Sequence, residues 1–295
     1  MAANNVISAA TEQSFPEPAD RSIGNILVDA GRLAPESAAR ILRLQREQNL
    51  RFGDAATQLG LLTPADIEFA LSRQFNHTHL RRGESKVSED LVAAYAPFSQ
   101  QSEALRAVRS QLMARWFDGN PGHKALAIVS AGRKDGRSFL AANLAVVFSQ
   151  LGANTLLIDA DLRNSSQHLL FGLDNRAGLS ALLSSRAAPE AIQRVPGLPE
   201  LSVLPAGVQP PNPHELLARA PFWKLLRDVE KKFDVVLLDS PAAAHYADAQ
   251  TVAVRAGAGL IVARKNATRT RQVRGVADTL SQATAIIIGA VVSDF

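Results

Sequence analysis

The sequence contains no cysteine among its 295 residues, which excludes disulfide bonds and thiolate metal sites. It also has no apolar run near the roughly 20 residues that a membrane-spanning helix needs. The apolar stretch 283–292 is far too short for that, and we predict a buried strand there. Residues 1–20 have no secretory pattern and are rich in Ala, Asn, Ser, Glu and Pro, so we expect a flexible tail. The composition permits a cytoplasmic globular protein.

Neither sign of charge dominates, because 32 Lys and Arg stand against 28 Asp and Glu, giving a formal net charge of +4. This balance is compatible with nucleotides, anionic lipid or nucleic acid and selects none of them. One basic stretch could form a polyanion patch, although we favour a solvated helix face and do not predict nucleic-acid binding. It comprises Arg264, Lys265, Arg269, Arg271 and Arg274.

The length suggests one large and one small domain, since domains most often contain roughly 100 to 150 residues. We divide the chain into a flexible tail (1–20), a tandem-repeat domain (21–76), a linker with a helix (77–122) and a phosphate-binding domain (123–295). The segment 77–100 contains mixed polar residues, Pro97 and few periodic apolar positions. We therefore expect it to be extended.

A spaced repeat relates residues 22–45 to residues 51–74. Gly24 matches Gly53, and Gly31 matches Gly60. In each copy a helix-like start leads to a glycine, and a proline then opens a second amphipathic helix. Such paired helical units bury their faces against each other.

This repeat resembles the small N-terminal (MshEN-like) domain of type II secretion and pilus ATPases, whose motif runs R-L-G-x-x-L-V-x-x-G. Some members of that family bind cyclic di-GMP, so the resemblance implies a second ligand site. The glycines would let a purine or phosphate approach the backbone, and Arg51 would supply charge or stack on the base. The alternative is a helical docking module with glycine turns. The candidate residues are Arg21, Gly24, Gly31, Arg51, Gly53 and Gly60.

A phosphate-binding loop follows the hydrophobic segment 124–130. Such loops read G-x-x-x-x-G-K-[ST], with glycines that let backbone N–H groups approach the phosphates and a lysine that reaches the outer two. Here Ala131 replaces the first glycine and Arg137 replaces the lysine. Arginine keeps the charge and can grip two phosphate oxygens, but its planar fork differs in shape from an ammonium group. We predict nucleotide binding and leave phosphoryl transfer open.

Acidic and hydroxyl side chains are expected to meet beside this loop. The loop opens a helix over 139–151, whose N-terminal amides favour anions, and Ser138 can offer its hydroxyl to magnesium. The strand 155–158 delivers Asp159 and Asp161 to the same sheet edge. One of them could accept a proton while the other holds hydrated magnesium. The strand 233–238 ends in Asp239, which is suited to a water-mediated magnesium contact.

Further strands are predicted over 201–204, 259–263 and 285–292. Strands that alternate with helices indicate an α/β fold with a doubly wound, mainly parallel sheet. A small, mainly helical domain precedes this P-loop domain.

These motifs resemble the bacterial tyrosine kinase family linked to exopolysaccharide synthesis, over roughly residues 97–295. With the N-terminal repeat added, the resemblance is to its EpsG-type branch, the chain length determinant protein tyrosine kinases. Further matching runs are Ala141-Ala142-Asn143-Leu144-Ala145, Leu204-Pro205-Ala206-Gly207, and Pro210-Pro211-Asn212-Pro213 before Glu215-Leu216-Leu217.

The resemblance implies ATP and Mg²⁺ as ligands and assigns roles to particular residues. Phosphate contacts would come from Gly136, Arg137 and Ser138. Asp159 would be the proton acceptor, with Asp161 and Asp239 around magnesium. Arg264 could face the adenine or form a surface salt bridge. The nucleotide-binding set also includes Gly132, Lys134 and Asp135, with Lys134 where the family has glycine.

A motif E-x-x-R-x-x-R lies on a predicted helix that runs to about Trp116. The spacing places Glu103, Arg106 and Arg109 on one stripe, where they can pair locally or reach a neighbouring subunit. In the bacterial tyrosine kinases this motif helps to assemble a ring of subunits, so the resemblance implies a homo-oligomer.

The sequence departs from the family in its tyrosines. Typical members carry a C-terminal tyrosine cluster that receives phosphate, whereas this sequence contains only Tyr95 and Tyr246. Phosphate would then go to another protein or residue, or nucleotide binding would itself be the output.

The leading hypothesis is an ATP-dependent cytoplasmic kinase that regulates polysaccharide chain length, peripheral to the inner membrane through a copolymerase (chain length determinant) partner. A second hypothesis is a non-catalytic, nucleotide-gated adaptor that senses a second signal. A partition or division-site ATPase is a third. It is disfavoured because Gly132 stands where those proteins carry an extra lysine.

Overall fold

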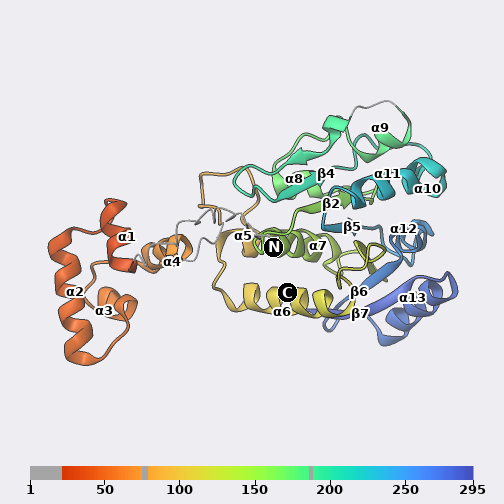
Figure 1. The fold of residues 1–295 in the computed structure, drawn as a ribbon. Helices are drawn as coiled ribbons and strands as arrows, with labels where there is room; N and C mark the ends of the chain where they lie inside the picture. Colours follow the sequence, from red (N-terminus) through yellow and green to blue (C-terminus); the bar gives the residue numbers. More distant parts are fainter. Residues whose placement is uncertain (1–21, 75–78, 186–188, 295) are drawn as a thin grey trace, which may run out of the picture. The chain divides into compact units, whose positions relative to one another are not determined.

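The computed structural model describes residues 22–74, 79–185 and 189–294. The chain divides into two compact units, residues 1–77 and 78–295 (Figure 1). The expected tail and Arg21 lie outside the described residues.

The N-terminal unit is built from two copies of the same helix pair. Its helices are α1 (Ile23–Asp29), α2 (Pro35–Gln48), α3 (Phe52–Gln58) and α4 (Pro64–Gln74). Gly31 and Gly60 follow the first helix of each copy with φ of +67° and +64°. These left-handed positions close matching caps, in which the next N–H returns to a carbonyl of the helix. The two copies are thus equivalent in backbone conformation.

The two copies pack by exchange, because α1 lies chiefly against α4 and α2 chiefly against α3. Their shared core includes Leu27 and Ile41, which are fully buried. Gly24 and Gly53 sit where helices meet. A Cβ at Gly24 would lie 3.3 Å from the Phe52 ring, and one at Gly53 would lie 3.3 Å from Ile67. Small residues here allow close helix packing.

The second unit contains a seven-stranded sheet with the order β3-β4-β2-β5-β1-β6-β7. All neighbours are parallel except β3 and β4. This confirms the predicted doubly wound, mainly parallel α/β fold. The strands are β1 (Ala125–Ser130), β2 (Thr155–Asp159), β3 (Gln193–Arg194), β4 (Leu201–Leu204), β5 (Val235–Asp239), β6 (Ala258–Arg264) and β7 (Ile286–Ser293).

Helices cover both faces of this sheet (Figure 1). One face packs against α5 (Val92–Tyr95), α6 (Gln100–Arg115), α7 (Arg137–Ser149) and α8 (Gln167–Phe171). The other packs against α9 (Leu179–Leu183), α10 (Pro213–Ala218), α11 (Ala220–Glu230), α12 (Asp248–Ala256) and α13 (Thr270–Gln282). The central strands β1, β2 and β5 are buried on both faces, which explains their continuous apolar sequences. No helix among the described residues is long and apolar enough to cross a membrane.

The expectation that the strand over 283–292 is buried was wrong. A strand forms there, but it is the edge strand of the sheet, and Ile286 and Val292 are 53% and 65% exposed. Hydrophobicity alone does not distinguish an edge strand from a central one.

The expectation of an extended linker over 77–100 was wrong for its described part. Residues 79–96, which we call the strap, pack on the rest of the second unit and bury Leu91, Ala93 and Ala94 completely. The Tyr95 hydroxyl donates to the Val87 carbonyl at 2.5 Å, which folds the strap on itself. Its apolar residues contact the core from an irregular chain, so they show no helical or strand period.

Candidate nucleotide-binding site

The phosphate loop joins the end of β1 to the start of α7 and turns through left-handed backbone conformations. Gly136, directly before the helix, has φ of +94°, and Lys134 has φ of +62°. A non-glycine residue in this region costs about 1–2 kcal/mol. Lys134 is exposed, so its charge faces solvent at the mouth of the loop.

Asp135 holds the loop together from inside. Its carboxylate accepts the Gly132 N–H at 2.7 Å and the Thr268 hydroxyl at 2.9 Å. The Ser293 hydroxyl donates to the Asp135 carbonyl at 3.1 Å. Asp135 is buried, and its side chain ties the loop to the segment after β6. The structure gives this predicted nucleotide contact a scaffolding role within the loop.

Arg137 is buried beneath the loop, with its side chain only 8% exposed. Its Nε donates to the Ser240 carbonyl at 2.6 Å, and Nη1 donates to the Ser130 hydroxyl at 2.6 Å and the Gly132 carbonyl at 3.0 Å. Nη2 lies 3.7 Å from Asp161 Oδ2. The guanidinium therefore joins β1, the residue after β5 and the loop through two nitrogens held in a fixed fork, an arrangement that the single nitrogen of a lysine cannot reproduce.

Asp159 and Asp239 are register partners on β2 and β5, and both are fully buried. Asp159 accepts the N–H groups of Ser166 and Gln167 at 3.0 Å on one oxygen and that of Asp161 at 3.2 Å on the other. Burial, reinforced by the charge of Asp239, raises the pKa of Asp159 well above its ordinary value. Burial also raises the pKa of Asp239, against the opposing effects of the Arg137 charge, the neighbouring Ser138 and the hydrogen bond from Gln167.

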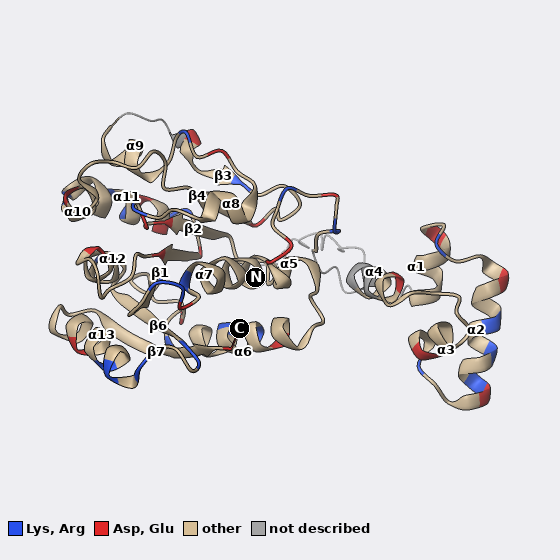
Figure 2. Ribbon diagram, turned by 180° about the vertical axis from the view of Figure 1, so that it is seen from behind, with Lys and Arg blue, Asp and Glu red and all other residues tan. Residues whose placement is uncertain are grey.

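Asp161 lies above this pair and faces the loop. One oxygen accepts the N–H groups of Arg163 and Asn164 at 3.2 and 2.8 Å, and the other faces Arg137. The structure thus brings Ser138, Asp161, Asp239 and Arg137 together at one edge of the sheet, where Figure 2 shows acidic strand ends beside the basic start of α7.

Sequence reasoning missed Gln167, the first residue of α8. Its Nε2 donates to Asp239 Oδ2 at 2.8 Å and to the Ser138 carbonyl at 3.1 Å. A glutamine in a segment of mixed polar residues carries no recognisable pattern. Only the tertiary structure brings it to the site.

The oxygen groups at this edge fit a hydrated magnesium ion. Asp239 Oδ1 and Gln167 Oε1 are buried without a hydrogen-bond partner, which leaves two oxygen acceptors free. No group of three or more His, Cys, Asp or Glu side chains forms a ready metal cage within the described ranges. Magnesium seldom uses such a cage, because it keeps several waters and binds one or two carboxylates together with substrate phosphates.

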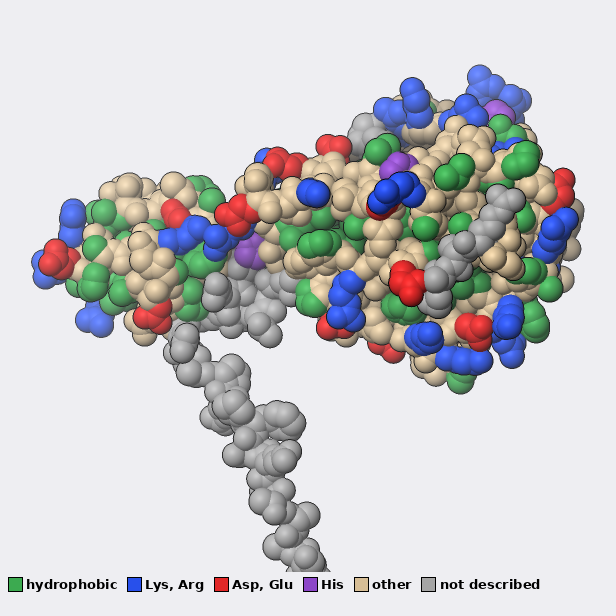
Figure 3. Space-filling model, turned by 90° about the horizontal axis from the view of Figure 1, so that it is seen from above, with side chains coloured by type: hydrophobic (Ala, Val, Ile, Leu, Met, Phe, Trp, Pro, Cys, Tyr) green, Lys and Arg blue, Asp and Glu red, His purple; other side chains and the backbone are tan. Residues whose placement is uncertain are grey.

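Arg264 lies at the same edge, two residues beyond the β6 partner of Ser130. It is partly exposed, and its N–H donates to the Thr268 hydroxyl that also holds Asp135. Farther along the basic stretch, Lys265 pairs with Asp294 at 2.6 Å, and Arg271 and Arg274 are exposed on α13. Charges of both signs are interspersed over the face of this unit in Figure 3.

The second-ligand candidates lie in the N-terminal unit. Gly24 and Gly53 serve helix packing, and Gly31 and Gly60 cap helices with open space at their Cβ positions. Arg51 is exposed and is the N-cap residue of α3. Packing and capping therefore account for all four glycines without a ligand.

The E-x-x-R-x-x-R residues lie on α6. Glu103 and Arg106 pair with each other, whereas Arg109 Nη1 donates to the Val147 carbonyl of α7 at 2.6 Å. Burial lowers the pKa of Arg109. Local contacts thus occupy all three residues, and Arg109 fixes α6 to the helix that begins at the phosphate loop.

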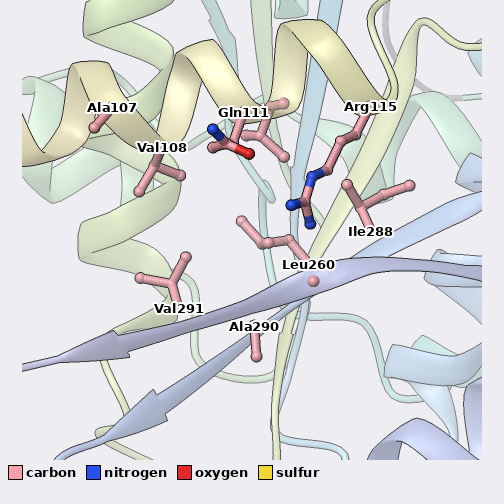
Figure 4. Close-up of a pocket in the computed structure, with 10 residues that line it drawn as sticks. Ala107, Val108, Gln111, Arg115, Leu260, Ile288, Ala290 and Val291 are labelled. Carbon is pink, nitrogen blue, oxygen red and sulfur yellow. The ribbon is translucent and has the colours of Figure 1, made fainter.

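A groove of about 370 Å³ separates α6 from β7 (Figure 4). Val108 and Leu112 line it from the helix, and Ile288 and Val291 line it from the strand. Arg115 projects into it from the end of α6. The groove is apolar and adjoins the exposed edge of the sheet.

Together, the parallel sheet order and the loop between β1 and α7 define a protein of the P-loop class. No protein-family model matches the sequence. The chain is 32% identical over 209 residues to the tyrosine-protein kinase YwqD of Bacillus subtilis, covering 71% of this chain and 87% of that protein. It is 34% identical over 199 residues to the putative tyrosine-protein kinase CapB of Staphylococcus aureus, covering 67% and 86%.

Solved structures give the same result. The kinase domain of the Escherichia coli tyrosine kinase ETK matches with a TM-score of 0.67 and 32% identity, covering 75% of this chain and 85% of that one. The cell-division ATPase MinD of Pyrococcus furiosus matches with a TM-score of 0.51 and 25% identity, covering 57% and 71%. The chain belongs to the family of bacterial tyrosine-protein kinases.

Proposed function

We propose that residues 78–295 bind magnesium-ATP at the edge formed by the phosphate loop, β2 and β5, and transfer its terminal phosphoryl group to a tyrosine hydroxyl of another protein. The observation that carries this is the convergence of Ser138, Asp161 and Asp239 beside the start of α7, with Arg137 against Asp161. Backbone N–H groups at a helix start bind phosphate oxygens.

Within this proposal, Ser138, Asp161 and Asp239 would hold magnesium, which would neutralise charge on the phosphates. The tyrosine oxygen forms the new P–O bond, the bond to the leaving ADP breaks, and a carboxylate takes the hydroxyl proton. The family resemblance assigns that proton to Asp159. Asp159 is fully buried with both oxygens already accepting, whereas Asp161 retains 4% exposure. Asp161 is therefore the second candidate for the acceptor.

Titration of the full chain with magnesium-ATP tests the site. Binding should collapse in Asp161→Ala, while Asp174→Ala, which changes an exposed acid paired with Arg176, should bind like the parent chain. Equal binding by the parent and Asp161→Ala would refute the site.

A second candidate function is a non-catalytic adaptor that changes state on binding nucleotide. It is favoured by Arg137, whose Nε and Nη1 atoms are committed to Ser240, Ser130 and Gly132. Transfer of radiolabelled phosphate to a tyrosine peptide separates the two functions. Transfer that disappears in Asp159→Asn or Asp161→Asn supports the kinase, whereas binding without any transfer supports the adaptor.

We also propose the role implied by the family resemblance: regulation of exopolysaccharide chain length at the inner membrane through a copolymerase. Co-purification with the cytoplasmic segment of such a copolymerase, retained in the parent chain and weakened by nucleotide removal, would support this role. Unchanged polymer length on deletion of the protein would refute it.

Homo-oligomer formation is proposed through α6 and the adjoining edge of β7. Exposed apolar edge strands pair readily with other chains, and β7 presents Ile286 and Val292 without a charged residue in the strand. Sedimentation of Ile286→Lys should show a loss of assembly. Leu169→Lys, which alters another exposed apolar residue on α8, is the matched control.

Cyclic di-GMP remains a proposed ligand of the N-terminal unit, resting on the repeat and on the exposed Arg51. Titration of the full chain should show binding that is lost in Arg51→Ala and kept in Arg43→Ala on α2. The absence of binding by the parent chain would leave this unit as a docking module.

A further inference from the structure

Gln167 connects three parts of the candidate site through hydrogen bonds. Its backbone N–H donates to Asp159 Oδ2, and its side-chain Nε2 donates both to Asp239 Oδ2 and to the Ser138 carbonyl. The side chain is fully excluded from solvent. An amide NH₂ has two donors, so both are in use. One residue thereby joins the acids of β2 and β5 to the first turn of α7.

Two unsatisfied oxygens lie at this junction, one on Gln167 itself and one on Asp239. Gln167 Oε1 and Asp239 Oδ1 are buried and have no hydrogen-bond partner. Buried polar atoms are nearly always paired with protein or ordered water, so orphaned acceptors in a functional cleft need a donor. Waters of a hydrated divalent cation are such donors.

We propose that Gln167 is a positioning residue of the magnesium–nucleotide site, which rests on the function proposed above. Its Nε2 orients Asp239 against the start of α7, and its Oε1 adds an acceptor for metal-bound water. Because the amide is neutral, it supplies this acceptor without a fourth negative charge beside Asp159, Asp161 and Asp239.

Gln167→Met tests this role, since methionine has a similar length but no donor. Binding of a fluorescent ADP analogue by the full chain is measured against magnesium concentration and also without magnesium. We expect the magnesium concentration for half-maximal binding to rise about tenfold, as for other residues that orient metal ligands. Binding without magnesium should change little. Gln193→Met is the control, because the Gln193 side chain bonds to the backbone of Asp174, away from the acids of the site.

Gln167→Glu provides a second variant that keeps the acceptor oxygen and replaces the donor NH₂ group with a second oxygen. It should also raise the magnesium requirement, while its melting temperature shows whether the fold persists. An unchanged magnesium requirement in a folded variant, or an equal loss of binding with and without magnesium, would overturn the proposal. If the parent chain binds no nucleotide, the proposed function itself fails, which is a distinct result.

A separate set of contacts concerns the strap, residues 79–96. The Ser88 N–H donates to the Leu170 carbonyl of α8 at 2.7 Å. The Ala93 N–H donates to Asn143 Oδ1 of α7 at 3.0 Å, and Nε2 of Gln150, the C-cap residue of α7, donates to the Ala93 carbonyl at 2.8 Å. The strap therefore holds both helices whose first residues form the nucleotide site.

The strap also lies against Gly172, the C-cap residue of α8. A Cβ there would lie 2.4 Å from the Lys86 carbonyl oxygen, closer than any real contact, and φ is +62°. Only glycine permits this approach. The helix α8 is thus fixed by Gln167 at its first residue and by the strap at its last turn.

We infer that the strap is a coupling element. A change in the conformation of its residues, which are the first after the N-terminal unit, alters the affinity of the site for magnesium–nucleotide. Because such coupling is reciprocal, nucleotide binding must then change the conformational equilibrium of the strap by the same free energy. Both directions can be measured.

Hydrogen exchange of the full chain with and without magnesium-ADP tests one direction. The amides of Leu80, Ser88 and Ala93, which bond to Ala94, Leu170 and Asn143, should exchange more slowly with ligand bound. Gly172→Ala tests the other direction and should raise the dissociation constant of magnesium-ADP about fivefold, within the usual range of coupling.

Gly119→Ala is the matched control, because Gly119 has φ of +89° and open space around its Cβ. It also places an alanine at positive φ, but no atom lies within 4 Å of the added Cβ and the strap is not displaced. Should Gly172→Ala fail to fold, Tyr95→Phe loosens the strap more gently by removing its hydroxyl bond. Two results would overturn the inference: hydrogen-exchange rates of the strap amides that do not change when magnesium-ADP binds, or equal magnesium-ADP affinities in Gly172→Ala and Gly119→Ala.

Discussion

Asp159 and Asp239 face each other in register on neighbouring strands, and each is wholly excluded from solvent. Burial raises the pKa of both carboxyl groups. A raised acid pKa means that the folded state keeps a proton which the unfolded state has already released. Stability from this source is present near the unfolded value of 3.8 and is lost as pH rises through the folded pKa.

Asp239→Asn should therefore stabilise the ligand-free protein at pH 8 and have little effect near pH 4. The asparagine cannot ionise, and its oxygen can still accept the Gln167 bond. Melting temperatures across this range check the prediction, with about 2–4 °C expected per kcal/mol. A pH-independent difference between variant and parent would contradict it.

Arg137→Ala should destabilise the fold as well as weaken nucleotide binding. It removes three hydrogen bonds and leaves Asp161 without its buried counter-charge. Losing one partner of a buried ion pair costs about 3–5 kcal/mol. Urea unfolding measures this cost, and Arg133→Ala on the exposed part of the loop should show almost none.

Arg137→Lys separates charge from hydrogen bonding. An ammonium cannot reproduce the fork that reaches Ser240 and Ser130 together. We expect an intermediate loss of stability and no gain in nucleotide affinity. A lysine variant that binds magnesium-ATP more tightly would show that position 137 acts chiefly on phosphate.

Thr268→Val should loosen the phosphate loop. The Thr268 hydroxyl donates to Asp135 and accepts the Arg264 N–H, so the change removes two bonds of about 1 kcal/mol each. Weaker nucleotide binding is expected by titration calorimetry. Thr279→Val on α13 removes only a local bond to Gly275 and serves as the control.

Gly31→Ala and Gly60→Ala should destabilise the N-terminal unit to the same extent. Each glycine closes the first helix of its copy in the left-handed region, where alanine costs about 1–2 kcal/mol. Circular dichroism melting of the full chain compares them. Clearly unequal effects would show that the copies are not energetically equivalent.

The sheet could be predicted because its strands are continuous apolar runs that end in Asp159, Asp239 and the loop. The parallel direction of the strands and the helix layers follow from such alternation, whereas the strand order does not. The convergence of the acids also followed, since parallel strands share a carboxyl edge.

Other features depend on long-range contacts that leave no local pattern. Gln167 reaches Asp239 over 72 residues, and the strap bonds to Asn143 over 50. The inward turn of Arg137 depends on the Ser240 carbonyl, 103 residues away. The local spacing of residues predicts helices, strands and loops. These pairings, in contrast, form only when the helices and the sheet pack together.

The exchange of helices in the N-terminal unit carries a consequence for its folding. Helix α1 packs chiefly on α4, and α2 chiefly on α3. Within either copy of the repeat, the two helices therefore do not bury each other's apolar faces. If the chain were cut between residues 49 and 51, each copy would have to bury its apolar faces against a second molecule of the same copy. An isolated copy should therefore form an intertwined homodimer or remain unfolded.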